Sequence, residues 1–367
     1  MNITEISIAQ LTIPLTRPFI TAVRRTECVD DVMVLIKTDC GNIGYGSAAS
    51  TPAITGDSTE SIITAIKQVL GPQLIGRPIC DLNLLLQRNN QVIAGNTSAK
   101  AAIDIALHDL FAQYCGLPLY RLLGGNSNSI NSCITISVKG IDEMVSDAVE
   151  LVAQGYSTVK IKLGLNPKED IRRARAIRQA VGKDIRLLID ANQGWSYEDA
   201  LRVINAFNQF DLNISLVEQP VKAQELIQLK AITEQVHCSV IADESCFSPK
   251  DALDIATLHA SDGVNVKLMK SGGIENAQAI YHIAQTAGME IMVGCMLESP
   301  VGVAAIASFA ASKPDILYAD LDPIFLIKEN YIRGGAQRQG NQIILSDKPG
   351  LGIEGVSQGI NWIGRVS

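Results

Sequence analysis

Four short apolar stretches decide the fold of this 367-residue chain: TVKIK at residues 158–162, RLLID at 186–190, ISLVE at 214–218 and VIAD at 240–243. Each stretch is rich in aliphatic residues and ends on a charged side chain, and the charged ends lie 25 to 28 residues apart. The sequence between them has the apolar spacing of amphipathic helices. Strands that alternate with helices at a regular period form a parallel sheet that is covered by those helices.

The same period continues on both sides of these stretches, from about residue 132 to residue 320. We expect eight strands, at residues 133–138, 158–163, 186–190, 214–218, 240–243, 263–268, 291–296 and 316–320. Helices are expected between them, for example at residues 168–181, 197–210, 223–235 and 276–287. Eight strands in such a series are typical of an α/β fold with a TIM-like parallel barrel. A doubly wound open sheet is the alternative arrangement.

The segments that flank the barrel have a different pattern. Residues 3–13 and 31–38 alternate apolar and polar side chains and are followed by a turn at residues 39–42, which predicts antiparallel strands. Residues 58–123 have helical spacing, so we expect an α+β domain here. The sequence after residue 320 returns to an alternating, glycine-rich pattern and should fold back on this domain. The predicted division is 1–125 for the α+β domain, 126–320 for the barrel and 321–367 for the returning segment.

Composition and charge exclude several classes of protein. Hydrophobic residues make up 47% and charged residues 19% of the chain, so a folded core is expected rather than disorder. The chain has 31 Lys and Arg against 38 Asp and Glu, and this acidic balance argues against a nucleic-acid partner. The first residues do not resemble a signal peptide, and the apolar stretches are shorter than the roughly 20 residues of a membrane span. We therefore expect a cytoplasmic protein without a membrane partner.

Three carboxylates follow one another at the ends of predicted strands three, four and five: Asp190, Glu218 and Asp243. The active site of a parallel barrel lies at these strand ends. Each carboxylate alone could be a helix cap, but three at one mouth would repel each other unless a cation neutralised them. The cysteines and histidines have no zinc spacing, so oxygen ligands and a hard ion such as Mg²⁺ are favoured.

Lysines occupy comparable positions on strands two and six. Lys160 and Lys162 are two residues apart and point to the same face of their strand, which must be the barrel interior because Ile161 points to the helices. We expect this crowding to lower the pKa of one amine and make it a general base. Lys267 on strand six faces Lys162 across the ring. Two opposed bases suit a reaction that removes a proton from one face of a carbon and returns it on the other.

Five motifs carry a resemblance to a known family: TVKIK at 158–162, LIDAN at 188–192, VEQP at 217–220, ADES at 242–245 and NVK at 265–267. Together they resemble the enolase superfamily, specifically its muconate-lactonizing-enzyme-like subgroup, and the resemblance covers essentially the whole chain. It implies an α+β capping domain, a modified (β/α)7β barrel and a C-terminal return to the cap. It also implies that Asp190, Glu218 and Asp243 bind Mg²⁺ and that Lys162 and Lys267 are the acid/base pair.

Within this subgroup, Asp320-Leu321-Asp322 resembles the Asp-x-Asp motif of dipeptide epimerases, which binds the substrate ammonium. The resemblance also implies that Arg24, in a capping loop, meets an acidic side chain of the second residue. The remaining candidates for substrate binding are Thr135, Lys160, Cys295 and Met296. The implied activity is Mg²⁺-dependent epimerisation of a dipeptide at its C-terminal residue, with an Ala-Glu dipeptide of the murein type as the first candidate. A homo-oligomer is also expected.

Three groups of alternatives stay open at this point. An N-acylamino-acid racemase, an o-succinylbenzoate synthase or a cycloisomerase would use the same framework without a substrate ammonium. A Schiff-base aldolase with Lys162 or Lys267 as nucleophile would leave the three carboxylates unexplained. A non-catalytic protein on the same scaffold would be expected to have lost a lysine or a carboxylate, and all of them are present.

Overall fold

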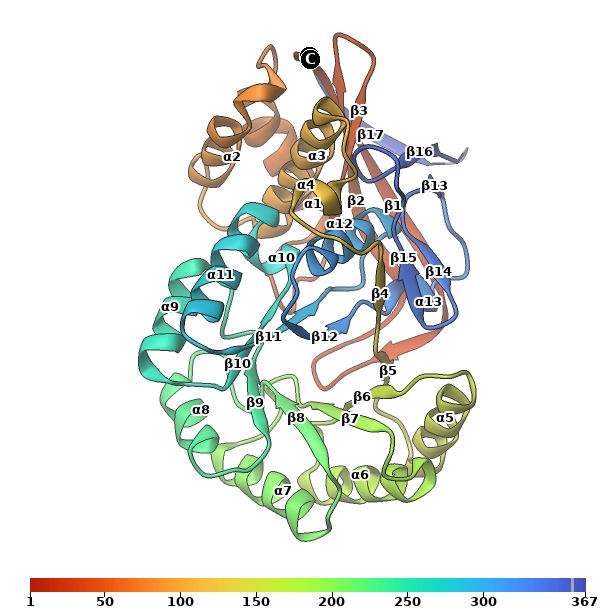
Figure 1. Cartoon of the computed structure of the whole chain (residues 1–367), viewed down its shortest axis with the longest axis vertical. Coiled ribbons are helices and arrows are strands. Elements are labelled where there is room, and N and C mark those ends of the chain that lie inside the picture. The colour runs from red at the N-terminus through yellow and green to blue at the C-terminus, as the bar shows by residue number, and fades with distance from the viewer. Residues whose placement is uncertain (358–359) are drawn as a thin grey trace.

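The computed structural model describes residues 1–357 and 360–367. The capping part is built on a four-stranded antiparallel sheet with the order β17-β1-β2-β3 (Figure 1). Its strands are β1 (Ile3–Ile20), β2 (Arg25–Thr38), β3 (Ile43–Ala49) and β17 (Asn361–Val366). The β2–β3 turn contains Gly41 with φ of 88°, a left-handed conformation that glycine adopts without strain.

Helices cover one face of this sheet. They are α1 (Thr59–Ala65), α2 (Leu82–Gln91), α3 (Thr97–Cys115) and α4 (Leu119–Leu122), with a π-helical turn at Ile66–Leu70 and 3-10 turns at Gly71–Gln73 and Ile79–Asp81. Helix α3 packs directly on β3, because a Cβ atom on Gly46 would overlap the carbonyl oxygen of Ala102. The α+β character expected for this part of the chain is therefore observed.

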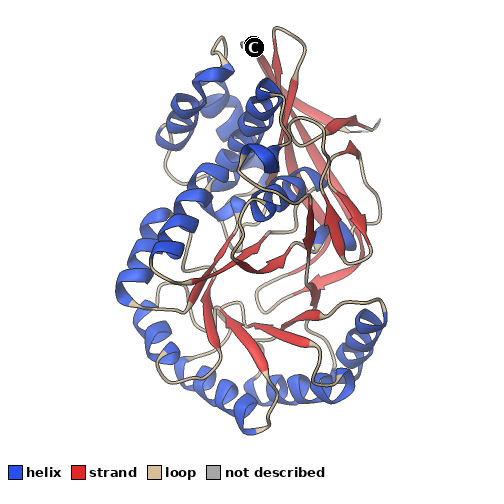
Figure 2. Ribbon diagram, viewed as in Figure 1, coloured by secondary structure: helices blue, strands red, loops and turns tan. Residues whose placement is uncertain are grey.

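The barrel is an eight-stranded parallel sheet with the order β12-β11-β10-β9-β8-β7-β6-β5, and its helices lie on the outside (Figure 2). The strands are β5 (Ile134–Ile136), β6 (Thr158–Lys162), β7 (Arg186–Asp190), β8 (Ile214–Glu218), β9 (Ser239–Ala242), β10 (Gly263–Val266), β11 (Glu290–Gly294) and β12 (Ile316–Asp320). The N–H of Cys133 donates to the carbonyl of Ala319 at 2.8 Å and joins the two end strands. The predicted barrel is confirmed, and the open doubly wound sheet is excluded.

The helices of the barrel are α5 (Ile141–Ala153), α6 (Pro167–Val181), α7 (Tyr197–Gln209), α8 (Leu226–Thr233), α9 (Pro249–Leu258), α10 (Leu268–Ser271), α11 (Ile274–Thr286), α12 (Pro300–Ala311) and α13 (Pro323–Leu326). An amphipathic helix follows most strands, as the sequence period predicts. After β12 only the four-residue α13 is present, so the barrel is of the (β/α)7β type.

The register of the strands sorts the inward side chains into layers. Lys160 pairs with Leu188, and two residues further on Lys162 pairs with Asp190, which in turn pairs with Glu218. The deeper layer is apolar and includes Cys133, Leu188, Leu216, Ile241 and Met292. The charged side chains therefore lie above an apolar floor, at the carboxyl ends of the strands.

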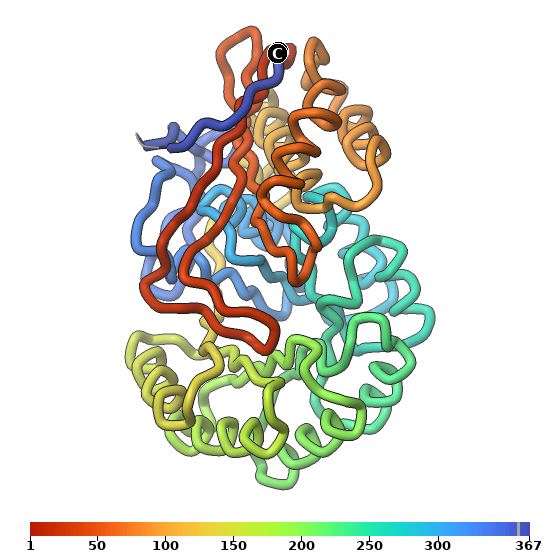
Figure 3. The backbone as a smooth tube through the Cα atoms, turned by 180° about the vertical axis from the view of Figure 1, so that it is seen from behind, coloured from red at the N-terminus to blue at the C-terminus, as the bar shows by residue number. Residues whose placement is uncertain are grey.

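The chain after the barrel returns to earlier segments. Strands β14 (Gln337–Gln339) and β15 (Gln342–Ile344) form a sheet with β4 (Ser129–Asn131), and β13 (Ile332–Gly334) pairs with β16 (Ile353–Val356). Strand β17 then lies beside β1 at the edge of the capping sheet (Figure 3).

Strand β1 is longer than the sequence predicts, because it continues to Ile20 and not only to Ile13. Its register with β2 shifts between Pro14 and Phe19, and its pairing with β17 stops at Gln10. The two prolines of this extension therefore lie at the register shift, and such an irregularity is where a strand tolerates proline. Among the described residues, the helices are all too short or too polar to cross a membrane.

Candidate active site

Three carboxylates meet at the mouth of the barrel. Asp190 and Glu218 end β7 and β8, and Asp243 follows β9 directly. One oxygen atom of each lies within 4.8 Å of the others, and all three side chains are buried. The structure therefore brings together the three predicted metal ligands, which reach this point because parallel strands end at the same edge of a barrel.

The charges of this cluster are strongly coupled. Burial, together with the neighbouring Asp190, raises the pKa of Glu218 to about 7. Burial would also raise the pKa of Asp190, but Lys160 and Lys162 lower it below its usual value. The pKa of Asp243 is lowered in the same way, by Lys267 against the effect of burial.

The donor set fits a hard divalent cation. Within the described residues, Glu218 Oε2 and Asp243 Oδ1 are buried and accept no hydrogen bond of good geometry. Amines approach them, with Lys160 Nζ at 2.7 Å from Glu218 Oε2 and Lys270 Nζ at 2.6 Å from Asp243 Oδ1. Carboxylate oxygens are the ligands that Mg²⁺ takes in proteins, and three of them converge here, so the residues present fit this ion.

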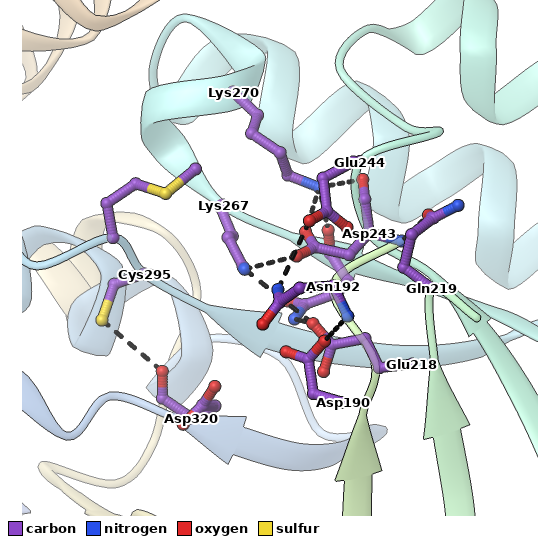
Figure 4. A network of polar contacts seen from close by, with 12 residues as sticks. Asp190, Asn192, Glu218, Gln219, Asp243, Glu244, Lys267, Lys270, Cys295 and Asp320 are labelled. Atoms are coloured by element: carbon purple, nitrogen blue, oxygen red, sulfur yellow. Dashed lines mark hydrogen bonds and ion pairs between the residues drawn. The ribbon is translucent and has the colours of Figure 1, made fainter. Parts of the chain in front are cut away.

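Two lysines flank the carboxylates and line the cavity above them. Lys162 Nζ lies 2.6 Å from Asp190 Oδ2, and Lys267 Nζ lies 2.6 Å from Asp243 Oδ2. They come from β6 and from the end of β10, which are separated by three strands of the sheet. Figure 4 shows Lys267 directed at Asp243 from one side of the cluster.

Lys160 is placed differently from the two lysines of the cavity. Its side chain is fully buried, and Nζ lies 2.7 to 2.9 Å from oxygens of Asp190, Glu218 and Asp320. It does not line the cavity. Lys160 therefore supports the acidic cluster from below, and its predicted contact with substrate stays a prediction.

The expectation that crowding lowers the pKa of a lysine is wrong for Lys160. Burial alone would lower the pKa of Lys160, but Asp190, Asp320 and Glu218 raise it well above its usual value. The pKa of Lys267 is also raised, because Asp243 and Glu218 outweigh burial. The carboxylates that the lysines touch have a larger effect than the repulsion between the lysines.

A second acidic group lies at the end of β12. Asp322 Oδ2 accepts the backbone N–H of Thr135 at 3.1 Å, and Asp320 Oδ1 lies 3.4 Å from Thr135 Oγ1. Burial and the neighbouring Asp320 raise the pKa of Asp322 to about 6. Burial raises the pKa of Asp320 too, but Lys160 and Lys162 bring it below its usual value. Asp322 forms no ion pair with a side chain of the described residues, so it is available to a cationic ligand.

The capping hairpin supplies the opening of the cavity. The tip between β1 and β2 is a tight turn in which the N–H of Thr21 donates to the carbonyl of Arg24 at 2.9 Å. The hairpin is attached to the barrel by the Ile20 N–H, which donates to Ser137 Oγ at 3.0 Å. Burial lowers the pKa of Arg24. No carboxylate of the described chain lies within ion-pair distance of this guanidinium.

The resulting cavity has a volume of about 520 Å³, which includes open solvent at its mouth. Nine of the predicted site residues line it: Arg24, Thr135, Lys162, Asp243, Lys267, Cys295, Met296, Asp320 and Asp322. The other three, Lys160, Asp190 and Glu218, lie behind this lining. The sequence therefore predicts the composition of one continuous site from residues spread between positions 24 and 322.

Sequence reasoning missed four polar residues of the same site. Asn192 and Glu244 line the cavity, and Asn192 Nδ2 lies 3.4 Å from Glu244 Oε1. Asn265 donates to Glu218 Oε1 at 2.9 Å. Lys270 contacts Asp243 (Figure 4). The alternation of strand side chains could have identified Asn265, two residues before Lys267. Lys270 has no such signal, because it lies on the short helix α10.

Fold and site together define a barrel enzyme with a cation site and two facing lysines. Residues 3–124 match the family described as mandelate racemase/muconate lactonizing enzyme, N-terminal domain, and residues 143–358 match the family described as enolase C-terminal domain-like. The chain therefore belongs to the mandelate racemase/muconate lactonizing enzyme family of the enolase superfamily.

Individual members of this family are similar to the chain over nearly its whole length. The L-Ala-D/L-Glu epimerase of Clostridium acetobutylicum is 50% identical over 97% of this chain and 100% of its own length. A substrate-liganded complex of the L-Ala-D/L-Glu epimerase from Bacillus subtilis has a TM-score of 0.96 at 41% identity and covers 97% of this chain and 100% of that one. The dipeptide epimerase from Enterococcus faecalis complexed with Mg and L-Leu-L-Tyr has a TM-score of 0.93 at 39% identity and covers 96% and 99%.

Proposed function

We propose that this chain is a Mg²⁺-dependent dipeptide epimerase, which inverts the α-carbon of the C-terminal residue by a 1,1-proton transfer. One observation carries the proposal: a single cavity is lined by two lysines beside a cation site and by an aspartate pair that faces the same space. Such a cavity can hold a substrate with a carboxylate at one end and an ammonium at the other. The relatives named above, which are dipeptide epimerases, support it.

Asp190, Glu218 and Asp243 would hold the Mg²⁺ ion. When bound, the ion supplies positive charge that stabilises the negative charge on the substrate carboxylate as the α-proton leaves. Lysine amines also contact these carboxylates, so a bound ion would share their negative charge with Lys160, Lys162, Lys267 and Lys270.

Lys162 and Lys267 would transfer the proton. One amine, in its neutral form, takes the α-proton from one face of the carbon, and the opposite ammonium gives a proton to the other face. The reverse reaction exchanges the two roles, so both epimers are interconverted without a net change in protonation of the site. Each side chain is fixed by a 2.6 Å contact to a carboxylate, which orients its amine toward the cavity.

Asp320 and Asp322 would bind the N-terminal ammonium of the dipeptide. The raised pKa of Asp322 is the expected result of a buried carboxylate that waits for a cationic partner. A single amino acid would place its ammonium next to its carboxylate, beside the cation site, so a dipeptide fits better. An N-acylamino-acid racemase remains the second candidate, because the same bases and cation site would serve it without using the aspartate pair.

Arg24 would select the side chain of the residue that is epimerised. Its guanidinium lines the cavity, carries no ion pair with a described residue and is partly removed from solvent, so an acidic side chain would satisfy it. Ala-Glu is therefore the first dipeptide to test. Thr135, Cys295 and Met296 would contact the rest of the dipeptide.

The proposal is tested with a dipeptide library in deuterated water, read by mass spectrometry for deuterium at the α-carbon. We expect incorporation into the C-terminal residue of free dipeptides, with Ala-Glu among the best substrates. N-acetyl-Ala-Glu is the matched control, because it lacks only the ammonium. Equal turnover of the acetylated and the free dipeptide would move the N-acylamino-acid racemase to first place, and no exchange with any dipeptide would refute the proposal.

We further propose the domain division at 1–125, 126–320 and 321–367, a cytoplasmic location and a homo-oligomer. The pairing of β17 with β1 supports the assignment of the final segment to the capping part.

A further inference from the structure

The five residues between β11 and α12 fall into two groups. Cys295, Met296 and Leu297 line the active-site cavity and are called the 295–297 wall below. Glu298 and Ser299 are completely buried behind this wall. The backbone N–H of Met296 donates to Glu298 Oε1 at 2.9 Å and closes the turn. The shape of the wall therefore depends on the two buried residues.

Ser299 is held by a carboxylate from the capping sheet. Asp31 on β2 accepts the backbone N–H of Ser299 at 2.8 Å, at the start of helix α12. The side chain of Ser299 makes no capping bond of its own, so Asp31 caps this helix from a distant part of the chain. Asp31 also accepts hydrogen bonds from the Ser47 hydroxyl at 2.6 Å and from the N–H of Ala48 at 3.2 Å.

Asp31 is fully buried, and no cation of the described residues lies within 4.0 Å of it. Burial of a carboxylate without a cation is unfavourable unless its hydrogen bonds are well made. The packing leaves little room for adjustment, since a Cβ on Gly302 would lie 2.5 Å from Glu298 Oε2 and 3.0 Å from Ser47 Oγ. The contact between the capping sheet and α12 is therefore fixed in position.

Strand β2, which carries Asp31, starts next to Arg24 at the tip of the capping hairpin. Asp31 thus connects the strand that positions Arg24 with the loop that forms the 295–297 wall. We propose that Asp31 is a positioning residue that fixes the spacing between Arg24 and this wall, and so sets the selectivity for the side chain of the epimerised residue. This inference rests on the proposed function.

The test compares kcat and KM for Ala-Glu and Ala-Leu in the wild type, Asp31→Asn and Asp109→Asn. Asp109 is the matched control, because it is also a buried carboxylate of the capping part and does not line the cavity. It accepts hydrogen bonds from the N–H groups of Tyr45 and Leu351 at 2.8 and 2.7 Å. We expect Asp31→Asn to change the ratio of the two kcat/KM values by about fivefold or more, mainly through KM. Asp109→Asn should lower the melting temperature but keep the ratio within about twofold.

The outcomes separate the two proposals. A wild type that epimerises no dipeptide refutes the proposed function, and this inference falls with it. An active wild type with an unchanged ratio in Asp31→Asn overturns the inference alone, as does an equal change in Asp109→Asn. If Asp31→Asn does not fold, Ser47→Ala replaces it, because it removes the 2.6 Å hydrogen bond to the same Asp31 oxygen that accepts the N–H of Ser299. An unchanged ratio in that variant has the same meaning.

Discussion

The barrel strands carry two inward layers that lie two residues apart and differ completely in chemistry. Leu188, Leu216 and Ile241 form an apolar layer without exposed surface. On the same strands or directly after them, Asp190, Glu218 and Asp243 form the acidic layer at the mouth. The comparison shows that the deeper layer is held together by apolar packing, while the upper layer brings buried carboxylates together through their contacts with lysines.

Lys160 joins the two layers. Its backbone pairs with Leu188 in the apolar layer, while its amine reaches the carboxylates of Asp190 and Glu218 above. A lysine with this geometry can place its charge in the upper layer and its methylene groups in the lower one. One residue can therefore belong to both layers, with the base of its side chain in the apolar layer and its charged end in the acidic layer.

The largest expected effect on activity comes from removing the cation from the upper layer. Exhaustive chelation should abolish epimerisation and addition of Mg²⁺ should restore it, because no side chain of the described chain can replace a divalent charge at Asp190, Glu218 and Asp243. Deuterium exchange at the α-carbon before and after chelation measures this. Full turnover after chelation, together with a full rate in Asp190→Asn, would remove the metal from the mechanism.

The next effect concerns the two facing lysines. Lys162→Ala and Lys267→Ala should each lower net epimerisation by about 10²- to 10⁴-fold, and one variant can still exchange the α-proton of one epimer because each amine reaches one face. Exchange of both epimers is measured separately by mass spectrometry. Lys183→Ala, at a surface lysine paired with Asp211, is the control. Equal exchange of both epimers by either active-site variant would contradict the two-base mechanism.

A smaller effect is expected at the second acidic group. Asp322→Asn should lower kcat/KM for free dipeptides by tens-fold, since removal of one partner from a shielded charge pair commonly costs about 2–5 kcal/mol. The same variant should act on N-acetylated substrates no worse than the wild type does. A comparable loss on both kinds of substrate would show that Asp322 has a structural role rather than an ammonium-binding one.

The apolar layer should respond in the opposite way. Leu216→Ala should lower the free energy of unfolding by about 2–5 kcal/mol and leave kcat/KM nearly unchanged below its melting temperature. Leu317→Ala is the control, because Leu317 on β12 is 46% exposed, and it should change stability by less than about 0.5 kcal/mol. If Leu216→Ala lost activity without losing stability, the two layers would not be separable.

The smallest effect tests whether buried charge is unfavourable away from the mouth as well. Burial raises the pKa of Asp109 to about 6 in the cap, so its stabilising effect is complete below its usual pKa of 3.8 and is lost as the pH rises through 6. Between pH 4 and pH 7, the free energy of unfolding of the wild type should fall by up to about 3 kcal/mol more than that of Asp109→Asn. Urea unfolding at several pH values measures this difference, and a constant difference would contradict it.

Much of the site could be predicted because its residues end apolar strands. Asp190, Glu218 and Asp243 each follow a short aliphatic stretch. Because the side chains of a strand alternate between its two faces, the place of each residue in its strand predicts whether it points into the barrel. The barrel itself is confirmed for the same reason. These are local signals, carried by a few neighbouring residues.

Other features depend on contacts that no local pattern records. Asp31 and Ser299 are far apart in the sequence and are joined by a hydrogen bond. Lys270 contacts Asp243 from a helix of four residues. The pKa expectation failed for Lys160 because the sequence shows which charges are near in the chain, not which are near in space. Distant pairs of this kind require the tertiary structure.

The pairing of Ile6 with Val366 has a consequence for synthesis of the protein. The first strand leaves the ribosome long before the edge strand beside it exists, and the entire barrel is translated in between. Until then the nascent capping sheet has an unpaired edge, which is a site for association with other chains. A chain arrested before β17 should therefore be more susceptible to protease and more often bound by chaperones than the released protein.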